Sequence, residues 1–171
     1  MEGENYMADF VMNTDGEYGK YITQNLQAPP MNEEFNEMYK KWAQRLLWMD
    51  TNVVPGAFQM NTSWYTNAPD MRPLFRHEEH VHDFDEMLGF LGSDYNDPYD
   101  LGAVIEIGIN GELHRLTKSS ILFMPAGLKH LPLTILEMRR PVLHFSISMN
   151  PLYTSTRTTG KEEGETSLYS Y

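Results

Sequence analysis

The sequence contains no cysteine among its 171 residues. This absence excludes disulfide bonds and every thiolate metal site, so a metal ion must be held by nitrogen and oxygen ligands. No apolar run approaches the roughly 20 residues that a membrane-spanning helix needs. The N-terminal residues also lack the basic start and apolar middle of a signal peptide. We therefore expect a cytoplasmic protein that does not act at a membrane.

Basic residues are few as well. The chain has 13 Lys and Arg against 24 Asp and Glu, which gives a formal net charge of −11. Such a surface repels phosphate backbones, and no local cluster of Lys and Arg offsets the repulsion. We therefore expect no binding to nucleic acids. Hydrophobic residues make up 41% of the chain, an ordinary value for a single globular domain with one core.

We divide this single domain into an N-terminal arm and helix (1–54), a barrel (55–150) and a polar C-terminal tail (151–171). The helix is predicted for residues 32–49, because apolar residues there repeat at spacings of three and four and form one stripe. The stripe consists of Phe35, Met38, Tyr39, Trp42, Leu46 and Met49. Residues 46–49 could form a strand instead. We expect the stripe to pack on a sheet or on a partner subunit.

From about residue 54 the pattern changes to short strands separated by turns. Residues 58–65, 103–109 and 141–149 alternate as half-buried strands do. Asn110-Gly111 is a strong hairpin signal. Many short strands without a regular strand–helix alternation predict a mainly-β sandwich or barrel.

Histidines and a glutamate in two separate segments point to chemistry. His80 and His82 are two residues apart on a predicted strand, so both side chains point to one face. Glu86 follows four residues later, close enough to join them after a slight bend. Much further along, Gly127 permits a tight turn that would present His130 from a neighbouring strand. Imidazole and carboxylate together suit Fe(II), Mn(II), Zn(II), Ni(II) or Cu(II).

These two segments resemble the motifs of the cupin superfamily, which read HxH, three or four residues, Glu, and then PxGxxH. Here they are His80-x-His82-xxx-Glu86 and Pro125-x-Gly127-xx-His130, and the resemblance covers about residues 55–150. It implies a mainly-β double-stranded β-helix, the cupin or jelly-roll barrel, with the predicted N-terminal helix packed on or beside it. It also implies one divalent transition metal (Fe, Mn, Zn, Ni or Cu) held by His80, His82, Glu86 and His130 inside one end of the barrel.

The sequence departs from the cupin pattern at positions that concern turns and packing. Leu74 and Ser119 stand where the family pattern has glycines, and Thr134 stands where an asparagine is frequent. The glycine after the glutamate comes one position early, at Gly92. These departures leave the four ligand candidates intact.

The resemblance favours a metal-dependent enzyme, an oxygenase, lyase or isomerase, that acts on a small organic molecule by Lewis-acid catalysis or dioxygen activation. Glu86 is one candidate for moving a proton, and Tyr65 and His144 are two others if they line the pocket. His144 faces the interior if the alternate residues of its strand pack outward. The alternative is a metal-containing module that binds or senses a small molecule without turnover. The aromatic stripe and the outward faces of the strands suggest a homodimer.

Overall fold

The computed structural model describes residues 16–24, 37–68 and 79–150. Within these ranges the chain forms a short 3-10 helix, η1 (Gly19–Tyr21), and eight strands. The strands are β1 (Ala43–Met49), β2 (Gln59–Tyr65), β3 (Glu86–Gly92), β4 (Asp100–Ile109), β5 (Glu112–Lys118), β6 (Ser120–Met124), β7 (His130–Met138) and β8 (Val142–Ser148). None of the helices in these ranges has the length and apolar character needed to span a membrane.

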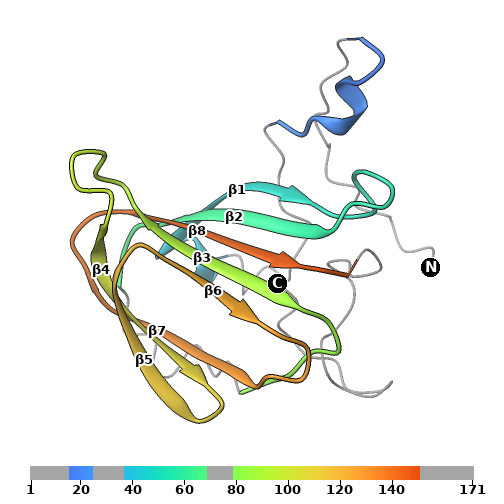
Figure 1. Ribbon diagram of the computed structural model, residues 1–171. Coiled ribbons are helices and arrows are strands. Elements are labelled where there is room, and N and C mark those ends of the chain that lie inside the picture. The colour runs from blue at the N-terminus through green and yellow to red at the C-terminus, as the bar shows by residue number, and fades with distance from the viewer. Residues whose placement is uncertain (1–15, 25–36, 69–78, 151–171) are drawn as a thin grey trace.

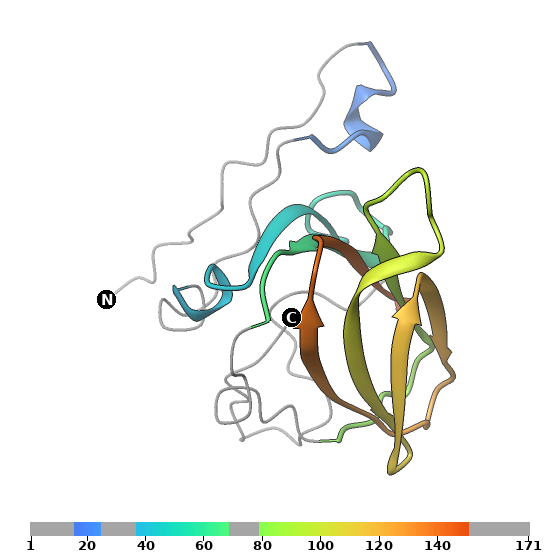
Figure 2. The same cartoon turned by 90° about the vertical axis from the view of Figure 1, so that its left-hand side faces the viewer.

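The strands form two antiparallel sheets that curve around a common interior (Figures 1 and 2). The larger sheet has the order β1-β2-β8-β3-β6 and the smaller one β5-β4-β7. From β3 onward the chain passes repeatedly between them, so that β3, β6 and β8 of the large sheet face β4 and β7 of the small one. The mainly-β double-stranded barrel implied by the cupin-like motifs is confirmed.

Both sheets contribute to one apolar core. Ile105 and Ile107 of β4 have no exposed surface, and Ile135 of β7 is nearly as buried. From the large sheet, Leu88 and Phe90 of β3 belong to the same cluster. The core therefore holds the two sheets together and fixes the strands that carry the candidate site.

The predicted helix over residues 32–49 is wrong for its second half. Residues 37–39 make a helical turn, but Ala43–Met49 is strand β1, paired with β2; residues 32–36 lie outside the described residues. The register shifts between Arg45 and Leu47. Such an irregularity breaks the strand period of two, so the apolar residues imitate helical spacing. Pairing with β2 and the burial of Trp48 stabilise the strand instead of a helix. The strand alternative for residues 46–49 is therefore confirmed.

The predicted hairpin turn at Asn110-Gly111 is confirmed. These two residues connect β4 to β5, and their φ angles are +48° and +82°. Positive φ at both central residues is the requirement of the two-residue turn that matches the twist of antiparallel strands. The turn places Ile109 opposite Glu112 and so fixes the β4–β5 register.

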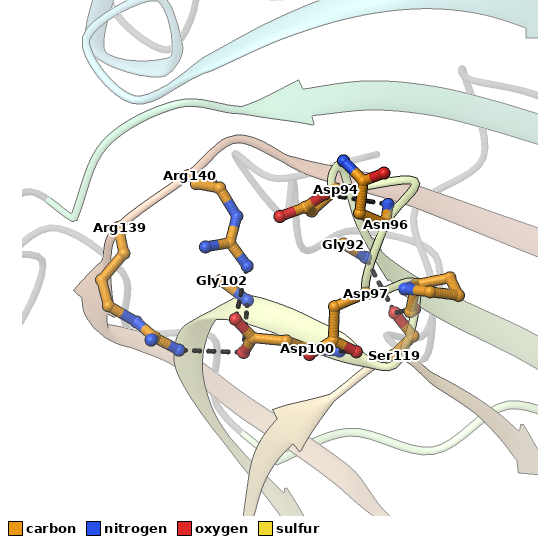
Figure 3. A network of polar contacts seen from close by, with 10 residues as sticks. Gly92, Asp94, Asn96, Asp97, Asp100, Gly102, Ser119, Arg139 and Arg140 are labelled. Carbon is orange, nitrogen blue, oxygen red and sulfur yellow. Dashed lines mark hydrogen bonds and ion pairs between the residues drawn. The ribbon is translucent and has the colours of Figure 1, made fainter.

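A polar network closes one end of the barrel (Figure 3). Asp100 at the start of β4 accepts hydrogen bonds from Arg139, Arg140 and the backbone N–H of Gly102. Ser119, which stands where the family pattern has a glycine, accepts a hydrogen bond from Gly92 N at 2.9 Å and donates one to Pro98 O at 2.7 Å. This network holds the connection between β3 and β4, at the end of β3 opposite to Glu86.

On β2 and β8, the part of the large sheet next to Glu86 turns polar side chains inward and apolar side chains outward. On β2, Gln59 and Asn61 are buried, whereas Met60 between them is 38% exposed. On β8, Ser146 and Ser148 are buried and the residue between them is only half-buried. This arrangement reverses the usual distribution on these two strands, whereas β3 of the same sheet contributes Leu88 and Phe90 to the apolar core.

Gly89 is a packing constraint on the outer face of this sheet. It lies directly opposite Phe145 in the β3–β8 register, and the Phe145 ring occupies the space that a β-carbon would need. This close approach leaves no room for a larger residue at position 89.

We expect Gly89→Ala to lower the free energy of unfolding by about 1–3 kcal/mol, the usual cost of overpacking. Urea unfolding measures this loss. In a Phe145→Leu background the same change should cost much less; an equal cost in both backgrounds would contradict this explanation.

Candidate metal centre

Backbone pairing brings the two histidine-containing segments together. His80 and the first residue of β7, His130, form an antiparallel bridge in which each N–H donates to the other's carbonyl oxygen at 3.0 Å. The chain then bends at residues 83–84, and regular strand begins only at Glu86. The predicted strand that carries His80 and His82 is therefore interrupted, and the bend returns Glu86 to the same end of the barrel as His82.

The four predicted ligand residues converge at this end. The Nε2 atoms of His80 and His82 are 3.1 Å apart. Glu86 Oε2 lies 3.0 Å from His130 Nε2 and 3.7 Å from His82 Nε2. Ligand atoms of His80, His82 and His130 all lie within 4.8 Å of one another. Two ligands at right angles around an ion with bonds of about 2.1 Å are separated by roughly 3 Å, so these spacings suit one metal ion.

The tautomer of His130 makes this a site for a cation. Its Nδ1 lies 3.0 Å from the carbonyl oxygen of Leu128, which can only accept, so Nδ1 carries the hydrogen. In the neutral ring Nε2 then has a lone pair, and this buried atom has no hydrogen-bond donor among the described residues. The lone pair faces the carboxylate of Glu86, so a proton or a metal ion must lie between them.

Protonation of the site histidines follows from the same contacts. Burial disfavours the charged form of His130, but the hydrogen bond and charge of Glu86, together with Leu128 O, outweigh it and raise its pKa. Burial, with His80 and His130 nearby, lowers the pKa of His82 to about 3. His82 is therefore neutral at physiological pH, the form in which imidazole binds metals.

Supporting contacts fix the turn between β6 and His130. Gly127 has a φ of +83°, as its role in a tight turn requires, and its N–H donates to His82 O at 2.8 Å. Asp85, which sequence reasoning had not connected to the site, accepts a hydrogen bond from Ala126 N at 2.9 Å. Phe84 stacks on the His82 ring, with centroids 4.7 Å apart. The second motif is thus attached directly to the first.

An uncharged polar wall, formed by Gln59, Asn61, Ser146 and Ser148, continues from Glu86 across the large sheet. Gln59 on β2, Ser148 on β8 and Glu86 on β3 occupy one cross-strand row. Asn61 and Ser146 occupy the next inward-facing row, where Asn61 Nδ2 donates to Ser146 Oγ at 2.7 Å. These residues were not among the site residues predicted from the sequence. Their alternation on β2 and β8 was visible, but not the register that aligns them with Glu86.

Of the three candidates for proton transfer, the structure places only Glu86 at this centre. His144 is buried and faces inward, but it lies four residues from Ser148, about 13 Å along β8. Tyr65 pairs with Val142, still further from the Glu86 row. The His144 ring stacks between Tyr65 and Phe90, at 4.8 Å from each, and its Nδ1 lies 3.0 Å from Gly89 O. His144 and Tyr65 are therefore part of the packed core.

Comparisons with known proteins give only distant likeness. No family model and no curated protein matches the chain. Among solved structures, KdgF from Halomonas sp. is 10% identical with a TM-score of 0.38, over 63% of this chain and 77% of that one. An RmlC-like cupin from Shewanella frigidimarina is 13% identical with a TM-score of 0.37, over 64% and 77%. The Cnp3 cupin domain from Schizosaccharomyces pombe is 13% identical with a TM-score of 0.40, over 64% and 65%.

His144 should make the stability of the metal-free protein depend on pH. Burial lowers the pKa of His144 from 6.5 to about 4 in the folded state. Between these two pH values the His144 imidazole is protonated in the unfolded chain but neutral in the folded one. Stability is therefore complete above pH 6.5 and is lost as the pH falls towards 4, by on the order of 3 kcal/mol for this group.

Urea unfolding in the presence of a chelator, between pH 7.5 and 4.5, tests this expectation. A His144→Gln variant should lose less stability on acidification than the wild type, whatever its stability at neutral pH. His114→Gln, at an exposed position on β5, serves as the control and should keep the wild-type dependence. Identical pH dependence in the wild type and His144→Gln would show that His144 does not titrate in this way.

Proposed function

We propose that this protein is a metal-dependent enzyme that acts on a small organic molecule. One divalent transition metal ion, of Fe, Mn, Zn, Ni or Cu, is held by His80, His82, Glu86 and His130. The observation that carries the proposal is the position of the buried His130 Nε2, 3.0 Å from Glu86 Oε2 and close to the two other imidazoles. Neutral imidazole and carboxylate are the ligand types that such ions accept.

A bound ion would polarise a substrate oxygen as a Lewis acid or, if it is redox-active, support dioxygen chemistry. The protein's own residues bind and orient the substrate between two unlike walls. Ile107 and Leu133 of the small sheet exclude water, while the polar wall of the large sheet offers hydrogen bonds. Glu86 is placed to hold or move a proton at its carboxylate, as an oxygenase, lyase or isomerase requires.

One observation favours the alternative, a metal-containing module that binds a small molecule without turnover. The two other candidates for proton transfer, His144 and Tyr65, are stacked in the core away from the metal centre. Glu86 then has to serve both as ligand and as proton carrier. Reaction with candidate substrates in a single turnover separates the two functions, because a binding module forms a complex and releases it unchanged.

Elemental analysis of untagged protein, purified with and without oxygen, tests the metal site. We expect one equivalent of a first-row transition metal per chain and its loss in a His82→Ala, His130→Ala variant, with the affinity for the metal reduced by more than about 100-fold.

The affinity of the wild type for the metal should also fall as the pH falls. The ion competes with a proton for His130, which binds that proton more readily than a free imidazole does.

A His114→Ala variant is the matched control, because it removes an exposed imidazole from β5 and leaves the site intact. It should retain the full equivalent of metal. Failure of the wild type to take up metal after reconstitution with each candidate ion would refute the proposal, and so would equal metal loss in the control.

A further inference from the structure

We infer that the polar wall is a ligand-binding surface, on which Gln59 donates a hydrogen bond to a hydroxyl or carbonyl oxygen of a ligand that carries no charge beyond the one carboxylate or other oxygen group that meets the metal ion. This inference rests on the proposed function, because it places the ligand against the same metal centre. It adds a residue and a ligand class to that site.

The register sets Gln59 beside the centre. Gln59 pairs with Ser148 across β2 and β8, and Ser148 pairs with Glu86 across β8 and β3. Adjacent strands are about 4.8 Å apart, so Gln59 and Glu86 are roughly 10 Å apart at their backbones. Both side chains point inward. A ligand of a few carbon atoms that meets an ion at Glu86 therefore also reaches the Gln59 amide.

The Gln59 amide nitrogen makes no hydrogen bond among the described residues that would stabilise the fold. Gln59 is 1% exposed, and its Nε2 atom is buried with no hydrogen-bond partner in the described part of the chain. Asn61, two residues on, has its amide satisfied by Ser146 Oγ. Buried amides without a partner destabilise a fold. Gln59 Nε2 is thus an unpaired donor within the polar wall, whose other amide is already paired.

Charge sets the ligand class. Among the fully buried polar and charged side chains of the described residues there is no Lys or Arg. A second carboxylate or a phosphate on the ligand would therefore lie in the barrel without a neutralising cation, at a high desolvation cost. An uncharged hydroxyl or carbonyl group finds a donor in Gln59 and an apolar surface opposite, on Ile107 and Leu133.

The first test compares Gln59→Leu with Asn61→Leu, which serves as the matched control. Without metal or ligand, Gln59→Leu should raise the melting temperature by about 2–4 °C, because it removes a buried unpaired amide. Asn61→Leu should lower it, since Ser146 loses its partner. Binding of Co(II) should be unchanged in Gln59→Leu. A lower melting temperature for Gln59→Leu would show that the amide supports the fold and would overturn the inference.

The second test uses glycerate and tartronate as probes, which differ in carrying a hydroxymethyl group or a second carboxylate. They are titrated into the Co(II)-loaded protein while its visible absorption is recorded. Relative to their affinities for free Co(II), the protein should favour glycerate. Gln59→Leu should weaken glycerate binding about threefold to tenfold, the loss of one neutral hydrogen bond.

Each outcome separates the two proposals. Wild-type protein that takes up no Co(II) refutes the metal site and this inference together. Protein that takes up Co(II) but does not bind glycerate, prefers tartronate, or binds glycerate equally well as Gln59→Leu, overturns the inference and leaves the metal site standing.

Discussion

The pairing of His80 with His130 is the contact on which the candidate site depends. Two backbone hydrogen bonds at 3.0 Å join segments that are far apart in the sequence. Because the bonds lie in the backbone, they bring the main chains of both histidines together independently of any bound ion. Gly127 N and the carboxylate of Asp85 extend the connection on either side of His82. The ligand set is therefore preorganised by strand pairing, which is the condition for tight binding with little loss of conformational freedom.

The aromatic residues that stabilise the fold and the residues of the candidate site lie at different ends of the barrel. At one end, His144 lies between the rings of Tyr65 and Phe90, and Trp42 packs edge-on against Tyr65 at 5.0 Å. Figure 3 shows the polar network that closes the connection between β3 and β4, remote from Glu86. The other end holds the imidazoles and the polar wall. Buried aromatic area is a large source of stability, so the first end can compensate for the polar groups desolvated at the second.

Sequence patterns correctly predicted those features of the fold and the site that depend on residues close together in the chain. The spacing of His80, His82 and Glu86 and the hairpin at Asn110-Gly111 follow from short-range rules, whereas the side to which His144 points could only be given conditionally. What failed depends on pairing between distant segments. The irregularity between Arg45 and Leu47 turned a strand into an apparent helix. The alignment of Gln59 with Glu86 passes through β8 and cannot be read from β2 or β3 alone.

The polar end is better explained by binding than by folding. Gln59 Nε2 is buried without a hydrogen-bond partner among the described residues, and the buried His130 Nε2 faces the carboxylate of Glu86 at 3.0 Å. Apolar side chains of similar size would avoid the desolvation cost at both positions. These two atoms flank Glu86, one on β7 and the other in its cross-strand row. Groups that oppose folding and share one location are typical of functional sites, and these two have complementary needs: a cation for His130, an oxygen acceptor for Gln59. A metal ion that carries an oxygen-bearing ligand would satisfy both at once.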